Sequence, residues 1–310
     1  MTCLGRETFS LRGGRRGYKD SEKSYFNERM IAVGKWSDGL RRVAALAAWA
    51  VLGVCLLAGV SGAEKKLSGI DQLKDQKLAA QRGTVGQYLA EDLLGEGHKE
   101  LLTTYEKYVD AIAALQQGKV RAVIMDEAPA QRFLKSMENL AVMQEPLSEE
   151  SYAIGFKKGN TELRDQVNAA LSAMKADGTL AAIMEKYNGD TAVKPEDIDL
   201  NKGAEGGKLI MGTEAGFAPY ELKVGNGYIG IDIEMAAGIA KRLSRELVVE
   251  NMNFDALPMA VASGKVDMIC AGITVTEDRR KNMDFSDNYV EGAKQVAVVR
   301  ADDCEAPAGK

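Results

Sequence analysis

A polar segment that follows a short apolar run constrains the fold of this chain more than any other feature. The apolar run contains Val266, Met268 and Ile269. It leads into residues 271–279, which read Ala-Gly-Ile-Thr-Val-Thr-Glu-Asp-Arg, and more charged residues follow. This pattern predicts a buried strand whose end opens into a polar loop and then into the start of a helix.

Three residues of this segment offer groups that can hold a small anion. Arg279 carries a planar fork of donors that suits a carboxylate. Thr274 can donate and accept a hydrogen bond, and Gly272 lets a ligand approach the backbone closely. The alternative is purely structural, with Arg279 on a solvated helix and Thr274 as its cap.

Size and charge place limits on what the chain can be. It has 310 residues, 45% of them hydrophobic and 27% charged, so a sizeable core and about two domains are expected. Ten Lys or Arg and five Asp or Glu lie in residues 1–63, which leaves 30 basic and 40 acidic residues in 64–310, a formal charge of −10. This acidic balance argues against nucleic acid as a partner.

Cysteine and histidine usage narrows the chemistry further. Cys3 and Cys55 precede residue 64, Cys270 lies in the predicted buried strand, and Cys304 lies in a tail, 301–310, that we predict to be disordered. A free core thiol at Cys270 is therefore favoured over a bridge. The single histidine, His98, excludes multi-histidine metal sites and most histidine-based catalysis.

Residues 1–63 are typical of an export leader. Arg41 and Arg42 precede an apolar run over 43–60, and Ser61-Gly62-Ala63 end it. A basic region, an apolar region and small residues before a cut form the pattern of a secretory signal, so we predict cleavage after Ala63 and a periplasmic location. Two alternatives stay open: a lipid anchor on Cys55, or an uncleaved leader. Translation could also begin at Met30.

From residue 64 onward the pattern is that of an α/β protein. A strand is expected over 78–81, a turn over 82–84 and a helix over 85–94. A second helix is expected over 109–117, and a strand over 120–125 ends at Asp126. A glycine-containing turn before a helix presents unpaired N–H groups that suit an anion.

Several segments, in their order and spacing, resemble the periplasmic polar-amino-acid-binding proteins of ABC importers, solute-binding protein family 3. The resemblance implies two α/β lobes joined by two hinge strands, closing around a free amino acid. Segments 81–84 and 115–126 resemble the second lobe. Those that resemble the first lobe are 208–221, 230–237, 253–257, 283–289 and 295–300.

The halves stand in the reverse of the family's order. Residues 176–187 resemble the end of the family's chain and 208–211 its beginning, so we predict a circular permutation with 188–207 as the linker. The resulting division is a second lobe over 64–150, a hinge strand over 151–156, a first lobe over 157–187 and 208–295, a hinge strand over 296–300 and the tail.

For the ligand's carboxylate, the resemblance implies Arg279 with the backbone near Thr274. The N–H groups at Thr84 and Val85 would close over it. Many relatives carry a hydroxyl where Val85 stands, so this chain can offer only its backbone there.

For the ligand's ammonium, the resemblance implies Asp126, Thr274 and the carbonyl of Gly272. A carboxylate at a strand end is a sound partner for a buried cation. The alternative for Asp126 is to cap a helix that would begin near residue 128.

For the ligand's side chain, the resemblance implies stacking on Phe217 and Phe254. Glu214 would face the distal end, with Gln81 and Met125 nearby, although core packing is the default for either phenylalanine. Glutamine-specific relatives tend to carry a lysine where Gln81 stands. Without it, Glu214 would be an uncompensated acid, which favours a basic ligand such as arginine or lysine over glutamine.

A binding protein of this kind needs no catalytic group, cofactor or metal, and its partner would be an ABC permease in the cytoplasmic membrane. We expect a monomer. A dehydratase-type enzyme on the same fold is the alternative from another class, because fold does not fix function. It would need a proton donor, and only Glu214 could serve. A sensor domain is the third interpretation.

Overall fold

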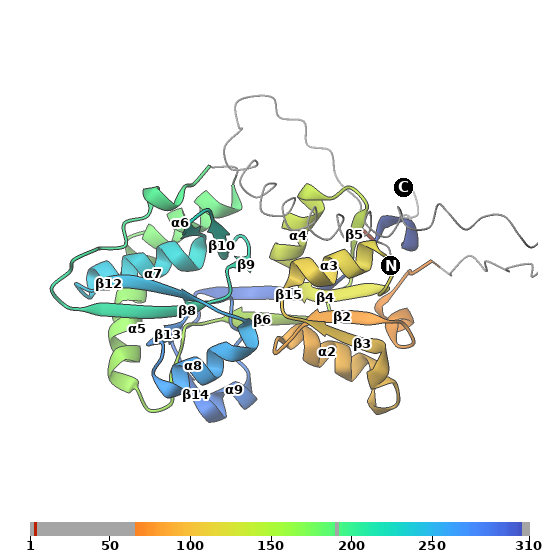
Figure 1. Ribbon diagram of the computed structural model, residues 1–310, viewed down its shortest axis with the longest axis horizontal. Coiled ribbons are helices and arrows are strands. Elements are labelled where there is room, and N and C mark those ends of the chain that lie inside the picture. Colours follow the sequence, from red (N-terminus) through yellow and green to blue (C-terminus); the bar gives the residue numbers. More distant parts are fainter. Residues whose placement is uncertain (1–2, 5–65, 190–191, 306–310) are drawn as a thin grey trace, which may run out of the picture.

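The computed structural model describes residues 3–4, 66–189 and 192–305, and in them the chain forms two α/β lobes, each built on its own sheet (Figure 1). The predicted fold class, mixed α/β with two lobes, is confirmed. Of the predicted leader, only residues 3–4 are described; its apolar run, Cys55 and the cut after Ala63 lie outside the described residues. In the described ranges, no helix is both long and apolar enough to cross a membrane.

We call the part built on the larger sheet the seven-strand lobe. Helices α2 (Val85–Leu94), α3 (Tyr108–Gln116) and α4 (Glu127–Ser136) pack on this sheet. The predicted strand over 78–81 and helix over 85–94 are confirmed residue for residue. The strands are β1 (Cys3–Leu4), β2 (Leu78–Gln81), β3 (Leu102–Tyr105), β4 (Ala122–Asp126), β5 (Leu140–Met143), β6 (Ser148–Tyr152) and β15 (Val290–Arg300).

The directions of the strands in this lobe bring two of the predicted site residues to one edge of the sheet. β2 pairs in parallel with β3 and with β4, whereas β15 runs antiparallel to β4, β5 and β6. Every residue of β2 and β4 is buried, as expected for parallel strands covered on both faces. The two strands therefore end side by side, with Gln81 and Asp126 at the same edge.

We call the part built on the other large sheet the five-strand lobe. Its strand order is β12-β8-β13-β7-β14. A small three-stranded sheet, β9 (Gly216–Phe217), β10 (Glu221–Val224) and β11 (Gly227–Ile229), lies beside it and contacts α7. The large-sheet strands are β7 (Gly155–Lys157), β8 (Lys208–Thr213), β12 (Glu246–Asn251), β13 (Met268–Ile269) and β14 (Met283–Phe285). The helices are α5 (Thr161–Ala176), α6 (Thr179–Asn188), α7 (Ile231–Arg242), α8 (Leu257–Ser263) and α9 (Glu277–Asn282).

Segments far apart in the chain share this lobe. The predicted inward face of α5 is confirmed, because Leu163, Val167, Ala170, Leu171 and Met174 are its buried residues. α5 and α6 pack against each other and against α7, although about twenty residues separate α6 from the next strand. In the same way β7 pairs with β13 and β14.

The chain passes between the sheets twice (Figure 1). β6 pairs with β15 in the seven-stranded sheet, and β7, two residues later, pairs in the five-stranded sheet. The second passage lies between β14 and β15, over residues 286–289. Residues 296–300, which were predicted as the second hinge strand, follow this passage and pair with β4 and β5 inside the seven-stranded sheet. Two short connections of this kind are the geometry from which hinge motion arises.

Residues 192–207 are docked on the five-strand lobe. Val193 and Ile198 are buried, and residues 195–197 form a short 3-10 helix that contacts β11. The backbone N–H of Leu247 donates to the carbonyl of Leu200 over 2.9 Å. The 3-10 helix of this segment is η4 (Pro195–Asp197), and the other 3-10 helices of the described residues are η2 (Ile70–Leu73), η3 (Glu96–Leu101), η5 (Phe254–Ala256) and η6 (Ala301–Asp303).

The prediction for Cys270 is confirmed and the one for the first residues of the tail is wrong. Cys270 is fully buried and free. Residues 301–303 form a 3-10 helix, and Cys304, which is buried, is disulfide-bonded. Arg121, which is buried, donates from Nη1 to Asp303 Oδ1 over 2.9 Å. This ion pair orders a stretch whose local sequence is polar and unpatterned.

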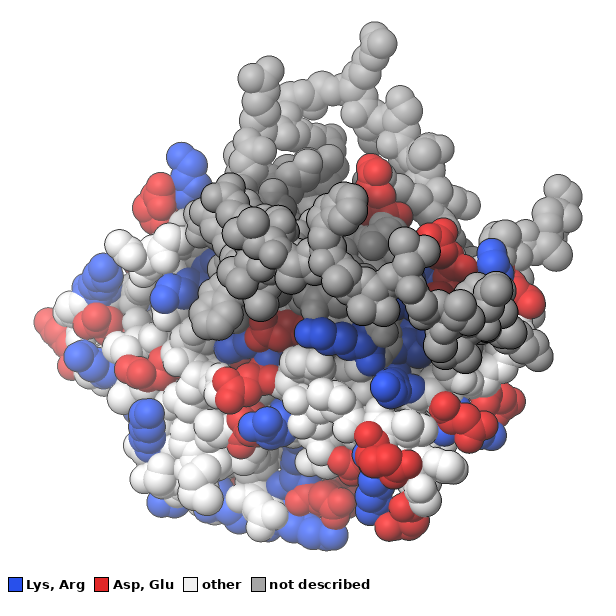
Figure 2. All heavy atoms as spheres, turned by 45° about the vertical axis from the view of Figure 1, so that its right-hand side comes forward, with Lys and Arg blue, Asp and Glu red and all other residues white. Residues whose placement is uncertain are grey.

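The charged surface carries no large basic field on the face drawn in Figure 2. Lys and Arg side chains are interspersed with Asp and Glu over the part of that face that the structure describes (Figure 2).

Candidate ligand-binding site

A pocket lies between the two lobes and brings together ten of the eleven predicted site residues. The residues from the seven-strand lobe that line it are Gln81, Thr84, Val85, Asp126 and Gln295. Those from the five-strand lobe and its small sheet are Glu214, Phe217, Glu221, Phe254, Ala271, Gly272, Thr274 and Arg279. Met125 does not line it. Its side chain is fully buried in the hydrophobic core, because successive residues of a strand point to opposite faces and Asp126 takes the pocket side.

Arg279 places a guanidinium at one end of the pocket. Thr276 caps α9, and its hydroxyl accepts from the Arg279 N–H over 3.2 Å. Nη1 donates to the Thr274 carbonyl over 2.8 Å, and Nη2 donates across the lobes to the Gly83 carbonyl over 2.9 Å. Arg279 is half-buried between exposed neighbours, so the alternative of a solvated arginine with Thr274 as the cap is wrong.

Among the described residues, no carboxylate forms an ion pair with Arg279. Desolvation by burial lowers its pKa, yet a guanidinium keeps its charge in proteins. The guanidinium carbon lies 5.5 Å from the centre of the Phe254 ring. Its hydrogen bonds described above go to neutral carbonyls, so a ligand carboxylate would give the guanidinium an opposite charge at hydrogen-bond distance.

The N-terminus of α2 faces the same end of the pocket. Thr84 caps the helix by accepting from the Gln87 N–H over 3.2 Å, and its hydroxyl donates to the Gln81 carbonyl over 2.7 Å. Gly83 has φ of 79°, and a Cβ there would lie 3.0 Å from the Cβ of Asp255 in the other lobe. The lobes therefore approach closely beside this N-terminus, whose first N–H groups have no intrahelical partner.

Asp126 supplies a buried carboxyl group opposite Arg279. It accepts hydrogen bonds from the hydroxyls of Tyr152 and, over 3.4 Å, Tyr108. Burial raises the pKa of Asp126 to about 7, and the Tyr152 hydroxyl works against that rise. Asp126 occupies the N-cap position of α4, but its side chain makes no capping hydrogen bond, so the capping alternative is wrong.

Glu150 adds a second acid that sequence reasoning missed. Its Oε2 accepts from the Thr274 hydroxyl over 2.6 Å and from Gln295 Nε2 over 3.5 Å. Because the Thr274 hydroxyl donates its hydrogen to Glu150, the lone pairs of the Thr274 oxygen can accept a hydrogen bond from a cation. Asp126, Glu150 and Thr274 together form an electronegative region suited to an ammonium group.

Aromatic rings wall the middle of the pocket. Phe217 stacks on Tyr108 of the other lobe, with ring centres 6.0 Å apart, and on Tyr220 at 5.6 Å. Gly272 has φ of 53°, and a Cβ there would lie 2.4 Å from the Phe217 ring. Only glycine fits at that position. The N–H of Gly272 donates to Asp232 Oδ2 over 2.9 Å, which holds the loop behind the ring.

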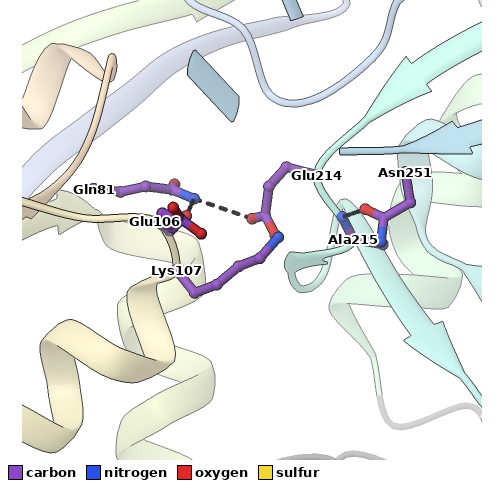
Figure 3. A network of polar contacts seen from close by, with 6 residues as sticks. All are labelled: Gln81, Glu106, Lys107, Glu214, Ala215 and Asn251. Carbon is purple, nitrogen blue, oxygen red and sulfur yellow. Dashed lines mark hydrogen bonds and ion pairs between the residues drawn. The ribbon is translucent and has the colours of Figure 1, made fainter. Parts of the chain in front are cut away.

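The distal end of the pocket contradicts one sequence-based argument. Glu214 was expected to be an acid without a cationic partner. In the structure it forms an ion pair with Lys107, and Gln81 Nε2 donates to its other oxygen over 3.2 Å (Figure 3). Lys107, the N-cap residue of α3, does not itself line the pocket, but its long side chain reaches the lining residue Glu214 from a position that strand and loop motifs do not indicate.

Three lining residues that were not predicted, among them Gln295 of the segment over 295–300, lie inside segments that the sequence already singled out. Ala271 begins the polar segment over 271–279, and Glu221 ends the segment over 208–221. Glu221 is fully buried, and burial raises its pKa well above the ordinary value, with repulsion from Asp232 as the next cause. In the described part of the chain, no group of three or more His, Cys, Asp or Glu could hold a metal ion.

Comparison with known proteins identifies the family. The sequence model for the bacterial extracellular solute-binding proteins, family 3, matches residues 15–190 and 209–305. The chain belongs to this family. The predicted membership is therefore confirmed.

Individual relatives match over parts of their length. The arginine-binding extracellular protein of Bacillus subtilis (strain 168) is 44% identical over 29% of this chain and 36% of its own length. A putative ABC transporter arginine-binding protein 2 of Escherichia coli (strain K12) is 33% identical over 41% of this chain and 53% of its own. A solved ancestral arginine-binding protein bound to glutamine is 46% identical over 26% of this chain and 36% of its own, with a TM-score of 0.25. The chain thus spans about a third to a half of these relatives.

Proposed function

We propose that the chain is the extracytoplasmic solute-binding component of an ABC importer and that it binds a free polar amino acid between its lobes. One observation carries the proposal: Arg279 and Asp126, of opposite charge when ionised, come from different lobes and line the same pocket. A zwitterionic amino acid presents a carboxylate and an ammonium a short distance apart. Binding it would therefore join the lobes.

Each end of the zwitterion has partners of matching chemistry. The ligand's carboxylate would accept hydrogen bonds from Nη1 and Nη2 of Arg279, beside the N-terminus of α2. It would replace the Gly83 carbonyl as the partner of Nη2. The ammonium would meet Asp126, the Thr274 hydroxyl and the carbonyl of Gly272. The aromatic rings of Phe217 and Phe254 would cover the aliphatic part of the side chain.

The pocket's distal end suits a polar side chain, and basic amino acids and glutamine are the candidates. Glu214 can accept from either, and both relatives named above are arginine-binding proteins. The sequence-based preference for a basic ligand assumed an unpaired Glu214. Because Lys107 pairs with it, that charge argument no longer separates the two classes.

The proposal includes export and a membrane partner. The predicted leader would carry the chain to the periplasm, where it would act as a monomer with an ABC permease, whether released, anchored through Cys55 or held by its leader. The two relatives are named as arginine-binding proteins, the second of them as one of an ABC transporter, which supports binding rather than catalysis.

We also propose the permuted order. In support, α5 and α6, which precede the linker, pack on α7, which follows it. The 157–187 and 208–295 segments would form the first lobe, joined by the 188–207 linker. A protease site placed within the linker tests this: cleavage should leave a nicked protein that elutes as one species. Separation of the fragments after cleavage would contradict the proposal.

The decisive experiment for the function is isothermal titration of the protein from residue 64 onward, refolded free of ligand, against the twenty amino acids. At least one polar amino acid should bind, and Arg279→Ala should abolish that binding. Arg280→Ala is the matched control, since Arg280 is the next residue and its side chain is 52% exposed. If no amino acid binds the wild-type protein, the proposed function is wrong.

A further inference from the structure

The ion pair between Lys107 and Glu214 joins the two lobes at the distal end of the pocket, where Glu214 lines the wall and Lys107 pairs with it. The exposed fractions of the two side chains are 18% and 3%. Lys107 begins α3 in the seven-strand lobe, and Glu214 follows β8 in the five-strand lobe (Figure 3). A cation of the protein itself thus occupies the place at which a ligand's terminal cation would meet Glu214.

Glu214 is fixed in this position by its neighbours. Gln81 Nε2 donates to Glu214 and also to the Glu106 carbonyl over 2.8 Å, which ties the carboxylate to the loop before α3 (Figure 3). On the other side, the N–H of Ala215 donates to Asn251 Oδ1 over 2.8 Å. The Ala215 bond holds the backbone next to Glu214, and the carboxylate cannot turn away without losing the Gln81 hydrogen bond and the Lys107 ion pair, so any ligand side chain meets the pair as it stands.

The pair treats cationic and neutral side chains differently. A guanidinium or ammonium group entering the pocket would have to displace Lys107 from a buried carboxylate or stand beside a like charge, and both are costly. A carboxamide can bind with the pair intact. Its oxygen accepts from the Lys107 ammonium, which has three N–H donors, and its NH₂ donates to the Glu214 carboxylate, which has several acceptor sites.

We infer that Lys107 is a specificity-determining residue that selects amino acids with a neutral ω-carboxamide, such as glutamine, over those with a cationic side chain. This inference rests on the proposed function, because it concerns the side-chain end of the same pocket. It goes beyond it by stating which polar side chain the protein takes and which residue excludes the others.

Titration calorimetry with glutamine, arginine and lysine tests the inference on the wild-type protein and on Lys107→Met, which keeps the length of the side chain and removes its charge. The wild-type protein should bind glutamine at least about tenfold more tightly than arginine or lysine. In Lys107→Met the ratio of the arginine Kd to the glutamine Kd should fall by about 100-fold, through tighter arginine and weaker glutamine binding.

Two further variants separate specificity from stability. Lys281→Met removes the same charge from an exposed ion pair with Asp278, where the lysine is 71% exposed, and should change neither Kd. Adding Glu214→Gln to Lys107→Met should weaken arginine binding relative to Lys107→Met alone. The added substitution removes the carboxylate that the loss of Lys107 has freed. Circular dichroism checks that each variant is folded.

The outcomes are distinguishable from failure of the proposed function. If Lys107→Met changes the Kd of all three amino acids by the same factor, or if the wild-type protein binds arginine as tightly as glutamine, this inference is overturned and the receptor function stands. If the wild-type protein binds no amino acid at all, both are overturned.

Discussion

The two ends of the pocket balance their charges in different ways. At the end lined by Arg279 and Asp126, the partners of each charged group include neutral ones: backbone carbonyls for the guanidinium, and tyrosine hydroxyls for the carboxyl. At the distal end, Glu214 is paired with a full opposite charge on Lys107. The difference indicates a division of roles.

Neutral partners leave a charge that a ligand can satisfy, and this holds for every amino acid because each carries the same carboxylate and ammonium. A paired charge gives nothing to the common part of the ligand and discriminates among side chains instead. We therefore expect mutations at the first end to weaken binding of all ligands and mutations at the second to reorder them. The following predictions test that contrast, beginning with the largest effect.

Replacing Asp126 by asparagine should weaken the binding of every amino acid by a similar factor in Kd. Loss of one partner of a buried charge pair costs about 2–5 kcal/mol, which corresponds to roughly 30- to 5,000-fold in Kd. Calorimetry with glutamine and arginine measures it. The control is Asp199→Asn, which removes an exposed carboxylate that pairs with Lys241 on the five-strand lobe and is 65% exposed. A loss confined to one of the two ligands would contradict the division of roles.

A methyl group at Gly272 should damage the aromatic wall and the protein's stability together. Gly272→Ala would place a Cβ 2.4 Å from the Phe217 ring at φ of 53°. We expect a loss of about 2–4 kcal/mol in the free energy of unfolding, from backbone strain and overpacking combined.

The matched control is Gly264→Ala, where φ is 78° and nothing lies within 4 Å of the new Cβ. It carries the backbone cost alone, about 1–2 kcal/mol. Urea denaturation of the two variants measures the difference. Equal losses would show that the Phe217 ring moves aside freely and does not form a fixed wall.

The contrast also explains which parts of the site the sequence predicts. The strand over 78–81 and the helix over 85–94 are predictable because the apolar run, the glycine-containing turn and the helix pattern are local. Phe217, Gly272, Thr274 and Arg279 follow from motifs whose residues lie close together in the chain. The zwitterion end of the pocket is made almost wholly of such local signals.

The distal end, and some contacts elsewhere in the molecule, depend on pairings that no local pattern contains. Lys107 meets Glu214 only because α3 begins beside the end of β8 in space, although 107 residues separate the two in sequence. Glu150 reaches Thr274 across a separation of 124 residues. The ion pair of Arg121 with Asp303, which orders residues that were predicted to be disordered, spans 182. In each case a long polar side chain crosses between elements, and periodicity does not predict its direction.

The smallest effect concerns pH and separates the ligand-free protein from the complex. The pKa of Asp126 is raised to about 7 by burial, so in the ligand-free protein this carboxyl keeps its proton up to near neutral pH. A ligand ammonium favours the carboxylate, so binding below pH 7 must release that proton. The Kd should therefore rise by at most about tenfold for each pH unit below 7 and be constant above about 8.

The same group has the opposite effect on the stability of the ligand-free protein. A carboxyl whose pKa is higher when folded than when unfolded contributes stability that is complete below about pH 4, the unfolded value, and is lost as the pH rises through 7. The ligand-free Tm should thus gain less from Asp126 at pH 8 than at pH 5, while the Tm increase caused by glutamine grows. Burial also raises the pKa of Asp232, to about 6. Asp232 therefore adds to the loss of ligand-free stability at higher pH, but not to the pH dependence of the Tm increase caused by glutamine. Thermal scans of the wild-type protein and Asp126→Asn from pH 5 to 8 separate the two acids. If the ligand-induced Tm shift is equally pH-dependent in both proteins, Asp126 does not hold the ammonium.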